Sequence, residues 1–432
     1  MRISKLSLPY LKRIMKSEDA AGLASNFISL TVVQGLNYIL PLITVPYITR
    51  VLGVTNFATV NIAVAIMAYF TIFTDYGFNL SATRDISINR DDKEKVSAIF
   101  SSVMVIKTIL CLIGLIVLTV MVFGIKALKD DYQVYLISYG LVFGNVLFPI
   151  WYFQGIEKMK YITPINIICR GVITVLIFVL VKNRDDAVIY AGLNSLSSIV
   201  IGLISLGLVF FKFKVRFRKP DLRNIKTQIV EGWYVFISSV SMVIYTSSTT
   251  IILGFVVSKE AAGYYAGADK IRVAVQGLIV PLFQTVYPYV NKLAKESTAK
   301  VLSFIRKELI IFGTAGFVLS LILSIKSDFV VVMFLGKEYL NSIEVLEVLA
   351  FAPFLVLLGN IVTVQGLLSL GLKKEYSRIY MITSVIGIIA MFLLIELFNA
   401  VGAAYAVLFI EALMVAFTLY YLKKKGISLF KR

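Results

Sequence analysis

The sequence of 432 residues contains no histidine and only two cysteines. The lack of histidine excludes catalytic triads, metal sites and proton relays that depend on an imidazole. Cys111 and Cys169 both fall in apolar stretches, so they predict free thiols within a membrane and no disulfide framework. The sequence likewise predicts no metal site and no bound cofactor.

Charged residues are also scarce, at 16% of the chain, whereas 59% of the residues are apolar and the mean hydropathy is +0.87. Soluble domains are nearer about 45–50% apolar. These values predict a membrane protein that crosses the bilayer many times. The net charge of +18 is spread over many loops and forms no single patch, which excludes nucleic acid as a partner.

Apolar runs recur along the whole chain, and a run of about 20 residues is long enough for one spanning helix. We predict an all-α fold with twelve spans in two pseudo-symmetric six-helix lobes. The predicted spans cover 24–46, 57–80, 97–123, 134–153, 161–181, 187–210, 229–257, 264–289, 305–325, 343–370, 376–397 and 400–422. Six spans in each half give both halves the same orientation, so an internal repeat would be parallel. Residues 57–63 fall over 262–268 at an offset of 205.

The most basic stretch, residues 211–228, divides the chain near its midpoint and carries seven Lys or Arg and one acidic residue. It predicts an N-terminal lobe over 1–210, a basic linker over 211–228 and a C-terminal lobe over 229–432. With twelve spans, 31 of the 43 Lys and Arg residues lie on the side of the linker and the termini, and 8 lie on the opposite side. The positive-inside rule therefore places both termini in the cytoplasm.

Several charges fall inside predicted spans, where a charge facing lipid costs about 2.5–3.5 kcal/mol. Glu231 and Glu396 lie near span ends, where they can reach the interface. Those farther from the ends include Lys107, Arg170, Asp269, Lys270, Arg272 and Glu411. The spacing of Asp269 and Arg272 predicts an ion pair on one helical face. The other cations predict a cavity that receives a phosphate or diphosphate head group, with Arg272 as a further head-group candidate and Arg84 at the cytoplasmic mouth. Glu411, with Asp269 as a second candidate, could bind a coupling H⁺ or Na⁺.

Two further stretches carry polar residues at helix ends. Residues 75–87 include Asp75, Gly77 and Arg84, and could form an ordinary helix exit. Residues 149–160 include Trp151, Gln154, Gly155 and Glu157. An interfacial aromatic belt explains Trp151 but not Gln154 or Glu157.

Together with residues 37–47, these stretches resemble the Wzx-type flippases of bacterial polysaccharide repeat units, which share a superfamily with multidrug and toxic compound extruders. The resemblance implies a two-lobed transporter in the bacterial inner membrane. It implies transfer of undecaprenyl-diphosphate-linked oligosaccharide to the periplasmic leaflet by alternating access, driven by a cation gradient. Its partners would be this lipid-linked oligosaccharide, membrane lipids, a polysaccharide polymerase and a chain-length regulator.

Two alternatives remain at this point. An exporter of drug-like cations has the same architecture but needs an acidic or aromatic cavity. A membrane-bound polysaccharide polymerase or ligase needs a large outer loop with catalytic groups, whereas the longest outer connection here is about 326–342. We therefore expect a transporter and not an enzyme. The sugar, the coupling ion, the oligomeric state and the choice among O-antigen, capsule and other pathways stay open.

Overall fold

The computed structural model describes residues 18–219, 222–277, 279–427 and 429, and in parts of α2, α11 and α13 it describes the backbone alone. The described chain folds into helices without any strand. This agrees with a bilayer environment, where every backbone amide must be satisfied inside its own helix. The predicted all-α class is confirmed.

The first half of the chain forms the N-lobe. Its helices are α2 (Glu18–Asp75), α3 (Phe78–Ile88), α4 (Lys93–Gly124), α5 (Lys126–Lys129), α6 (Tyr132–Ser138), α7 (Gly140–Leu147), α8 (Ile150–Gly155), η1 (Met159–Tyr161), α9 (Ile162–Leu180), η2 (Arg184–Asp186), α10 (Ala187–Gly207) and η3 (Leu208–Lys212).

The second half of the chain forms the C-lobe. Its helices are α11 (Leu222–Ile252), η4 (Leu253–Val257), α12 (Lys259–Gly277), α13 (Val280–Glu296), α14 (Thr298–Ile325), α15 (Ser327–Phe334), η5 (Lys337–Tyr339), α16 (Ser342–Leu349), α17 (Ala352–Gly359), η6 (Asn360–Leu368) and α18 (Lys373–Lys424).

Apolar side chains cover the outside of the bundle as well as its core. On α4, Ile109, Leu112, Ile116 and Val120 are all exposed. Their spacing of three or four residues places them on one face of the helix. A stripe of this kind faces lipid in a membrane protein, whereas in water it would be an aggregation site.

Two helices are long enough to hold two spans each, and each is broken by one residue. In α2 the break is at Gly53, with φ 69°, and in α18 it is at Asn399, with φ 53°. The described residues contain eight helical stretches long and apolar enough to cross a membrane, including Leu40–Ile88 and Lys373–Lys424. The described part of every predicted span is largely helical, but 57–80, 134–153, 264–289 and 343–370 are each interrupted between helices. The count of twelve stays a prediction.

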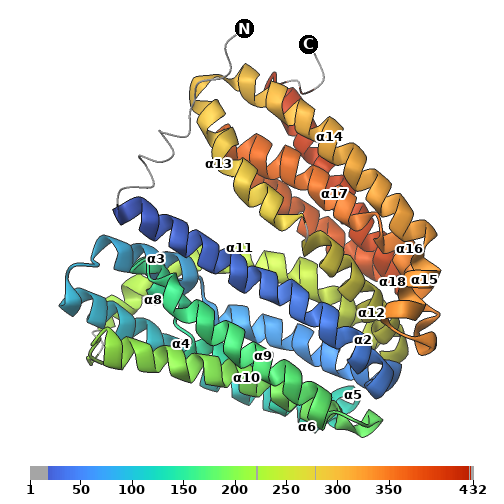
Figure 1. Ribbon diagram of the computed structural model, residues 1–432, viewed down its shortest axis with the longest axis horizontal. Coiled ribbons are helices and arrows are strands. Elements are labelled where there is room, and N and C mark those ends of the chain that lie inside the picture. Colours follow the sequence, from blue (N-terminus) through green and yellow to red (C-terminus); the bar gives the residue numbers. More distant parts are fainter. Residues whose placement is uncertain (1–17, 220–221, 278, 428, 430–432) are drawn as a thin grey trace.

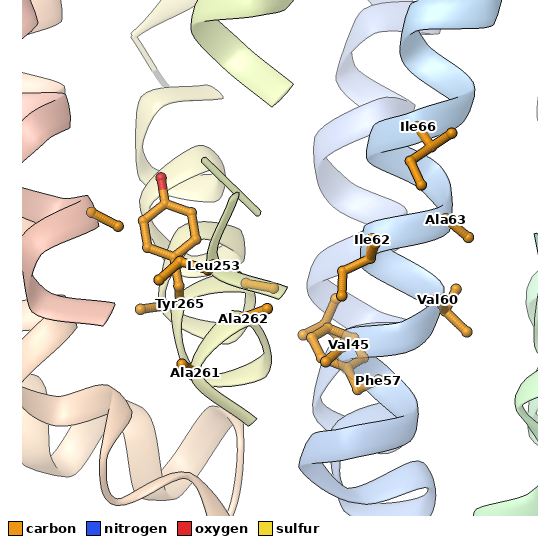
Figure 2. Packing of buried hydrophobic residues seen from close by; sticks show 14 of the residues in the cluster. Val45, Phe57, Val60, Ile62, Ala63, Ile66, Leu253, Ala261, Ala262 and Tyr265 are labelled. Atoms are coloured by element: carbon orange, nitrogen blue, oxygen red, sulfur yellow. The ribbon is translucent and has the colours of Figure 1, made fainter. Parts of the chain in front are cut away.

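The two lobes meet where α2 packs against α12, beside the break at Gly53 (Figure 1). Figure 2 shows the apolar part of this region, with Phe57 and Ile62 on α2 and Ala262 on α12. Thr55 donates a hydrogen bond to Glu260 at 3.2 Å, and these residues are 205 positions apart. Ala58 lies against Gly263, again at an offset of 205, where an added Cβ would be 3.3 Å from that of Ala58.

A pseudo-two-fold axis brings equivalent residues together in this way, because the same patch from each half must face itself. The offset found in the sequence is therefore also the offset at the contact between the lobes. We call the end of the molecule that holds Gly53 and Glu260 the break end. The opposite end, which holds α3, α8 and residues 213–219, is the linker end (Figure 1).

The basic linker is shorter than predicted. α11 begins at Leu222, so the predicted linker 211–228 includes the first helical turns of α11. The remainder is bound along α4, because the Arg216 and Arg218 amides donate to the hydroxyls of Ser97 and Ser101 at 3.3 and 2.9 Å. This segment is therefore a fixed strap on the N-lobe and not a free tether.

Candidate functional site

A cavity of about 320 Å³ lies inside the N-lobe, between α2, α7, α9 and α10. Its walls carry hydroxyl and amide side chains as well as apolar ones. The uncharged polar residues lining it are Thr44, Asn61, Thr174, Tyr190, Asn194, Ser197 and Ser198. Thr44, Asn61, Asn194 and Ser198 donate to carbonyl groups of their own helices, which leaves their oxygen lone pairs for a ligand.

Two cations line this same cavity, one from each lobe. Arg170 comes from α9, and Lys270 comes from α12 across the contact between the lobes. Lys270 makes no hydrogen bond or ion pair with any described residue, and it also lines a smaller adjoining pocket with Pro41 and Phe334. Both cations are half-buried, and a partly desolvated site strengthens their attraction for an anion compared with the open surface.

Lys107 lies elsewhere, and the prediction that it shares the cationic cavity is wrong. It is fully buried, and its ammonium group lies 2.8 Å from the Asp75 carboxylate. It also approaches the carbonyl and side-chain oxygens of Asn145, at 3.5 and 3.4 Å. Asp75, 32 residues earlier in the chain, compensates the charge of Lys107. Lys107 therefore joins α4 to α2 and does not bind a ligand.

The C-lobe contains a second cavity, of about 550 Å³, between α11, α12, α17 and α18. Asp269, Arg272 and Glu411 all line it. The predicted Asp269–Arg272 ion pair is confirmed, with the guanidinium at 2.7 Å from the carboxylate and a second bond to Gln276. Glu411 is buried, at 7% exposure, and one of its oxygens lies near Gly359.

The two stretches with polar helix ends pack against each other at the linker end, through α3 and α8. The Thr83 hydroxyl donates to the Trp151 carbonyl at 3.1 Å. A Cβ on Gly155 would lie 2.7 Å from the side chain of Ile86. Gly77 has φ 84°, and a Cβ there would lie 2.6 Å from Val235 of α11.

The other residues of these stretches also make local contacts. Trp151 is buried against Phe100, with ring centroids 5.5 Å apart. Exposed Glu157 has φ 57° and lies 3.7 Å from Arg90, and Gln154 is half-buried beside it. These positions therefore shape the fold at the linker end, and they do not line either cavity.

Arg84 lies outside both cavities. Its side chain is 59% exposed at the linker end and is paired with Asp85 at 3.0 Å. Asp85 also accepts a hydrogen bond from Gln228 of α11 at 2.8 Å. The predicted position of Arg84 at a mouth of the protein agrees with its exposure, whereas contact with a substrate stays a prediction.

Polar contacts between the lobes are concentrated at the break end. The Arg184 guanidinium pairs with Glu338, and Arg50 donates to the Met333 carbonyl at 2.5 Å. Tyr339 donates to the Gly53 carbonyl at 3.2 Å. Asp131 of the N-lobe pairs with Lys259 of the C-lobe.

At the linker end, the contacts described between the lobes are made by α11. Tyr76 stacks on Phe236, with ring centroids 4.9 Å apart. In Figure 1, α13 and α14 of the C-lobe diverge from α3 and α8 of the N-lobe toward this end. The break end is thus closed by direct contacts, and the linker end is spanned by one helix.

Residues 23–294 match the family model described as "Polysaccharide biosynthesis protein". The chain belongs to the polysaccharide biosynthesis protein family. It is 34% identical to a protein of Escherichia coli (strain K12) that is provisionally named an O-antigen transporter, over 93% of this chain and 97% of that protein. A protein of Shigella dysenteriae with the same provisional name is 31% identical, over 91% and 98%.

Solved structures show which fold this family member adopts. The lipid II flippase MurJ, in an inward closed conformation, aligns with a TM-score of 0.70 at 16% identity, over 93% of this chain and 87% of that one. An inward-facing multidrug transporter of the MATE family gives 0.65 at 14% identity, over 90% and 98%. An outward-facing one gives 0.58 at 15% identity, over 96% and 98%. The chain therefore has the fold of the MOP superfamily, as its sequence resemblance predicted.

The charges in the predicted spans indicated one cationic cavity, whereas the structure distributes them over two cavities and the Asp75–Lys107 pair. The Asp75–Lys107 pair escaped because the acid was assigned to a helix exit. The polar wall of α10, with Asn194 and Ser197, gave no signal beyond an ordinary apolar span. Among the described residues no group of three or more Cys, Asp or Glu side chains could hold a metal ion.

Proposed function

We propose that this chain is a flippase that moves undecaprenyl-diphosphate-linked oligosaccharide across the bacterial inner membrane by alternating access. One observation carries the proposal: Arg170 and Lys270, from different lobes, line one cavity. A diphosphate presents several acceptor oxygens and negative charge, and guanidinium and ammonium groups bind both. The family membership and the names of the relatives support a polysaccharide precursor as the cargo.

The size of the N-lobe cavity limits what it can hold. Its volume of about 320 Å³ is near the lower end for small-molecule sites, about 300–1,000 Å³. It therefore accommodates a diphosphate head group with its first sugar and not the whole oligosaccharide. The remaining sugars would extend toward the linker end, and the polyprenyl chain would stay in the surrounding lipid.

The orientation of the protein in the membrane sets the direction of transport. We place the linker end and both termini in the cytoplasm, because the excess of Lys and Arg lies on that side. The contacts of Arg184 with Glu338 and of Arg50 with Met333 would then close the periplasmic side. This arrangement is inward-facing, ready to receive cargo from the cytoplasmic leaflet.

Coupling to a cation gradient belongs to the same proposal. Glu411 and Asp269 line the C-lobe cavity, away from the head-group cations, so H⁺ or Na⁺ and cargo would bind in different lobes. Glu411 is the more buried of the two acids and lies at the centre of a predicted span, so it is the first candidate for the coupling ion. Polymerase and chain-length regulator proteins would take the repeat unit after its release.

Complementation tests this function directly. The chain is expressed in strains that lack their own flippase and make different repeat units, and surface polysaccharide is measured. We expect the wild type to restore it for at least one repeat unit. Arg170→Ala and Lys270→Ala should abolish it at normal expression, whereas Lys126→Ala, at an exposed site at the break end, should not. Failure of the wild type with every repeat unit, or normal activity of both cavity variants, would contradict the proposal.

One observation favours a second function. The C-lobe cavity is lined by Tyr265, Tyr376 and Tyr380 as well as Glu411, and such a site suits an organic cation. An exporter of cationic drugs would raise resistance of a sensitive strain in a way that depends on Glu411 and not on Arg170. Susceptibility tests beside the complementation assay separate the two functions.

A further inference from the structure

A buried acid in the C-lobe has no partner. Glu308 of α14 is 3% exposed, and neither oxygen of its carboxyl group makes a hydrogen bond within the described structure. It also makes no ion pair with a described residue. An ionised carboxylate in such a site would carry a desolvation cost of several kcal/mol with nothing to offset it.

The Gln365 side chain beside Glu308 also has unsatisfied hydrogen-bonding groups. Gln365 of η6 is 1% exposed, and both its amide nitrogen and its amide oxygen are also without a described partner. The Gln365 side chain faces the Glu308 carboxyl but lies outside hydrogen-bond geometry. A carboxylate can only accept hydrogen bonds, whereas a neutral carboxyl can also donate one. Only the neutral acid can satisfy both the oxygen and the nitrogen of a primary amide.

Charges on the packed elements are too far along their helices to compensate Glu308. The elements that pack most closely against α14 are α13, α15, α16, α17 and η6, and Val415 and Leu419 of α18 line a pocket with it. α17 and η6 carry no titratable residue. The described charges on the other three closely packed helices are at or near helix ends: Lys292, Lys295 and Glu296 on α13, Asp328 on α15, and Glu344 and Glu347 on α16. On α14 itself, Lys307 is exposed and Arg306 donates to the Leu429 carbonyl.

The element beside Glu308 has unusual geometry. η6 is a π-helix over Asn360–Leu368, and π-helical turns are rare and concentrate at functional sites. Asn360 and Val364 of η6 line the C-lobe cavity, whereas Gln365 faces Glu308. Glu308 therefore lies one helix behind the cavity, and a change in the winding of η6 would alter both sites together.

We propose that Glu308 is a proton-binding site, loaded in this conformation and emptied when η6 rearranges during transport. The loaded state stands on burial and missing partners alone. The emptying step rests on the proposed flippase function. It adds a proton site at Glu308, behind the C-lobe cavity, to the cation site proposed at Glu411.

Reaction with an apolar carbodiimide tests the loaded state without any substrate. These reagents modify carboxyl groups in their protonated form, so purified full-length protein in lipid nanodiscs is treated at neutral pH and its peptides are analysed by mass spectrometry. We expect labelling of Glu308 to exceed that of exposed Glu94 by at least about tenfold, since exposed carboxyls are ionised at neutral pH. Labelling should fall as the pH rises well above neutral, and Glu308→Gln should lack the modified peptide. Equal or absent labelling of Glu308 at neutral pH overturns the proposal.

The pH dependence of flipping tests the emptying step. Glu308→Gln keeps the shape of a neutral acid, so it should fold like the wild type but lose the increase in surface polysaccharide that an inward proton gradient drives. The control is Glu296→Gln, an exposed acid at the end of α13, which should keep that increase. A Glu308→Gln variant with the wild-type gradient response overturns the proton site while leaving the flippase function intact. Failure of the wild type itself to restore polysaccharide would instead contradict the flippase function, and the labelling result would still decide whether Glu308 is loaded.

Discussion

The Lys107 ammonium group lies 2.8 Å from the Asp75 carboxylate in the middle of the N-lobe, and Lys107 has no exposed surface. Asp75 also accepts a hydrogen bond from Asn79 at 3.2 Å. These contacts join α4 to Asp75, the last residue of α2, which lies two residues before the left-handed Gly77. Lys107 therefore stabilises the fold, although it is a lysine within a predicted span like Lys270 of the cavity.

Removal of one partner of this pair should destabilise the N-lobe. Lys107→Ala leaves Asp75 as a buried charge without compensation, which costs about 3–5 kcal/mol. We expect a lower thermal unfolding temperature and a lower yield of monodisperse protein in detergent. The double variant Asp75→Asn with Lys107→Met should recover most of the stability and should flip cargo. A double variant that is stable but does not flip cargo would show that Lys107 takes part in transport.

Arg170 and Lys270 should respond differently to substitutions that keep the charge. Arg170→Lys keeps a cation but loses the planar fork that binds two phosphate oxygens, so flipping should fall by about tenfold, equivalent to about 1.4 kcal/mol. Lys270→Arg should retain more activity, because guanidinium adds donors to the same cavity. Initial rates with a fluorescent lipid-linked substrate in proteoliposomes measure both. Unchanged flipping rates in Arg170→Lys would show that a single positive charge at this position is sufficient to bind the head group.

The Arg184–Glu338 pair should bias the protein toward the closed break end. Both side chains are well exposed, so the pair is worth about 0.2–1 kcal/mol, and its loss should shift the ratio of conformations by up to about fivefold. Spin labels on exposed Lys182 and Lys337, replaced by cysteine in a variant with neither native cysteine, report the distance between the lobes. Glu338→Arg should populate a longer distance. The swap of Arg184→Glu with Glu338→Arg should restore the shorter one, and an unchanged distance in the single variant would exclude a latch here.

The packing of α3 on α8 should be intolerant of one added methyl group. Gly155→Ala places a Cβ 2.7 Å from Ile86 and 3.0 Å from the Thr83 carbonyl, which overpacks a buried contact at a cost of about 1–3 kcal/mol. The matched control is Gly124→Ala, because no atom lies within 4 Å of its added Cβ. Thermal unfolding of both variants in the same detergent decides the matter. Equal stability would show that α8 can move away from α3.

The sequence was sufficient for the helical regions and for the half-chain repeat. Apolar runs of spanning length leave the backbone one way to satisfy its hydrogen bonds, so the described part of every predicted span is largely helical. The offset of 205 reappeared as a contact between Thr55 and Glu260. The breaks within α2 and α18 could not be predicted from hydropathy. Each depends on one residue with positive φ, Gly53 or Asn399, and hydropathy carries no information about φ.

The partners of buried charges could not be predicted, because they depend on helix rotation and depth. Arg170 and Lys270 are 100 residues apart and share a cavity, whereas Lys107 belongs to Asp75. Glu308 was missed because a lone acid near the start of a span is indistinguishable from one that reaches the interface. Only packing shows that neither of its oxygens has a partner.

The equivalence of the two halves at the contact between α2 and α12 also shows how far they have diverged. At the offset of 205, Val103 corresponds to Glu308, and Phe312 corresponds to Lys107. A homodimer of half-length chains would have to carry each of these charges twice, and each copy would need its own partner inside the membrane. A single chain carries each of these charges once. The proposed proton site at Glu308 therefore needs no counterpart in the other half, where the equivalent position is Val103.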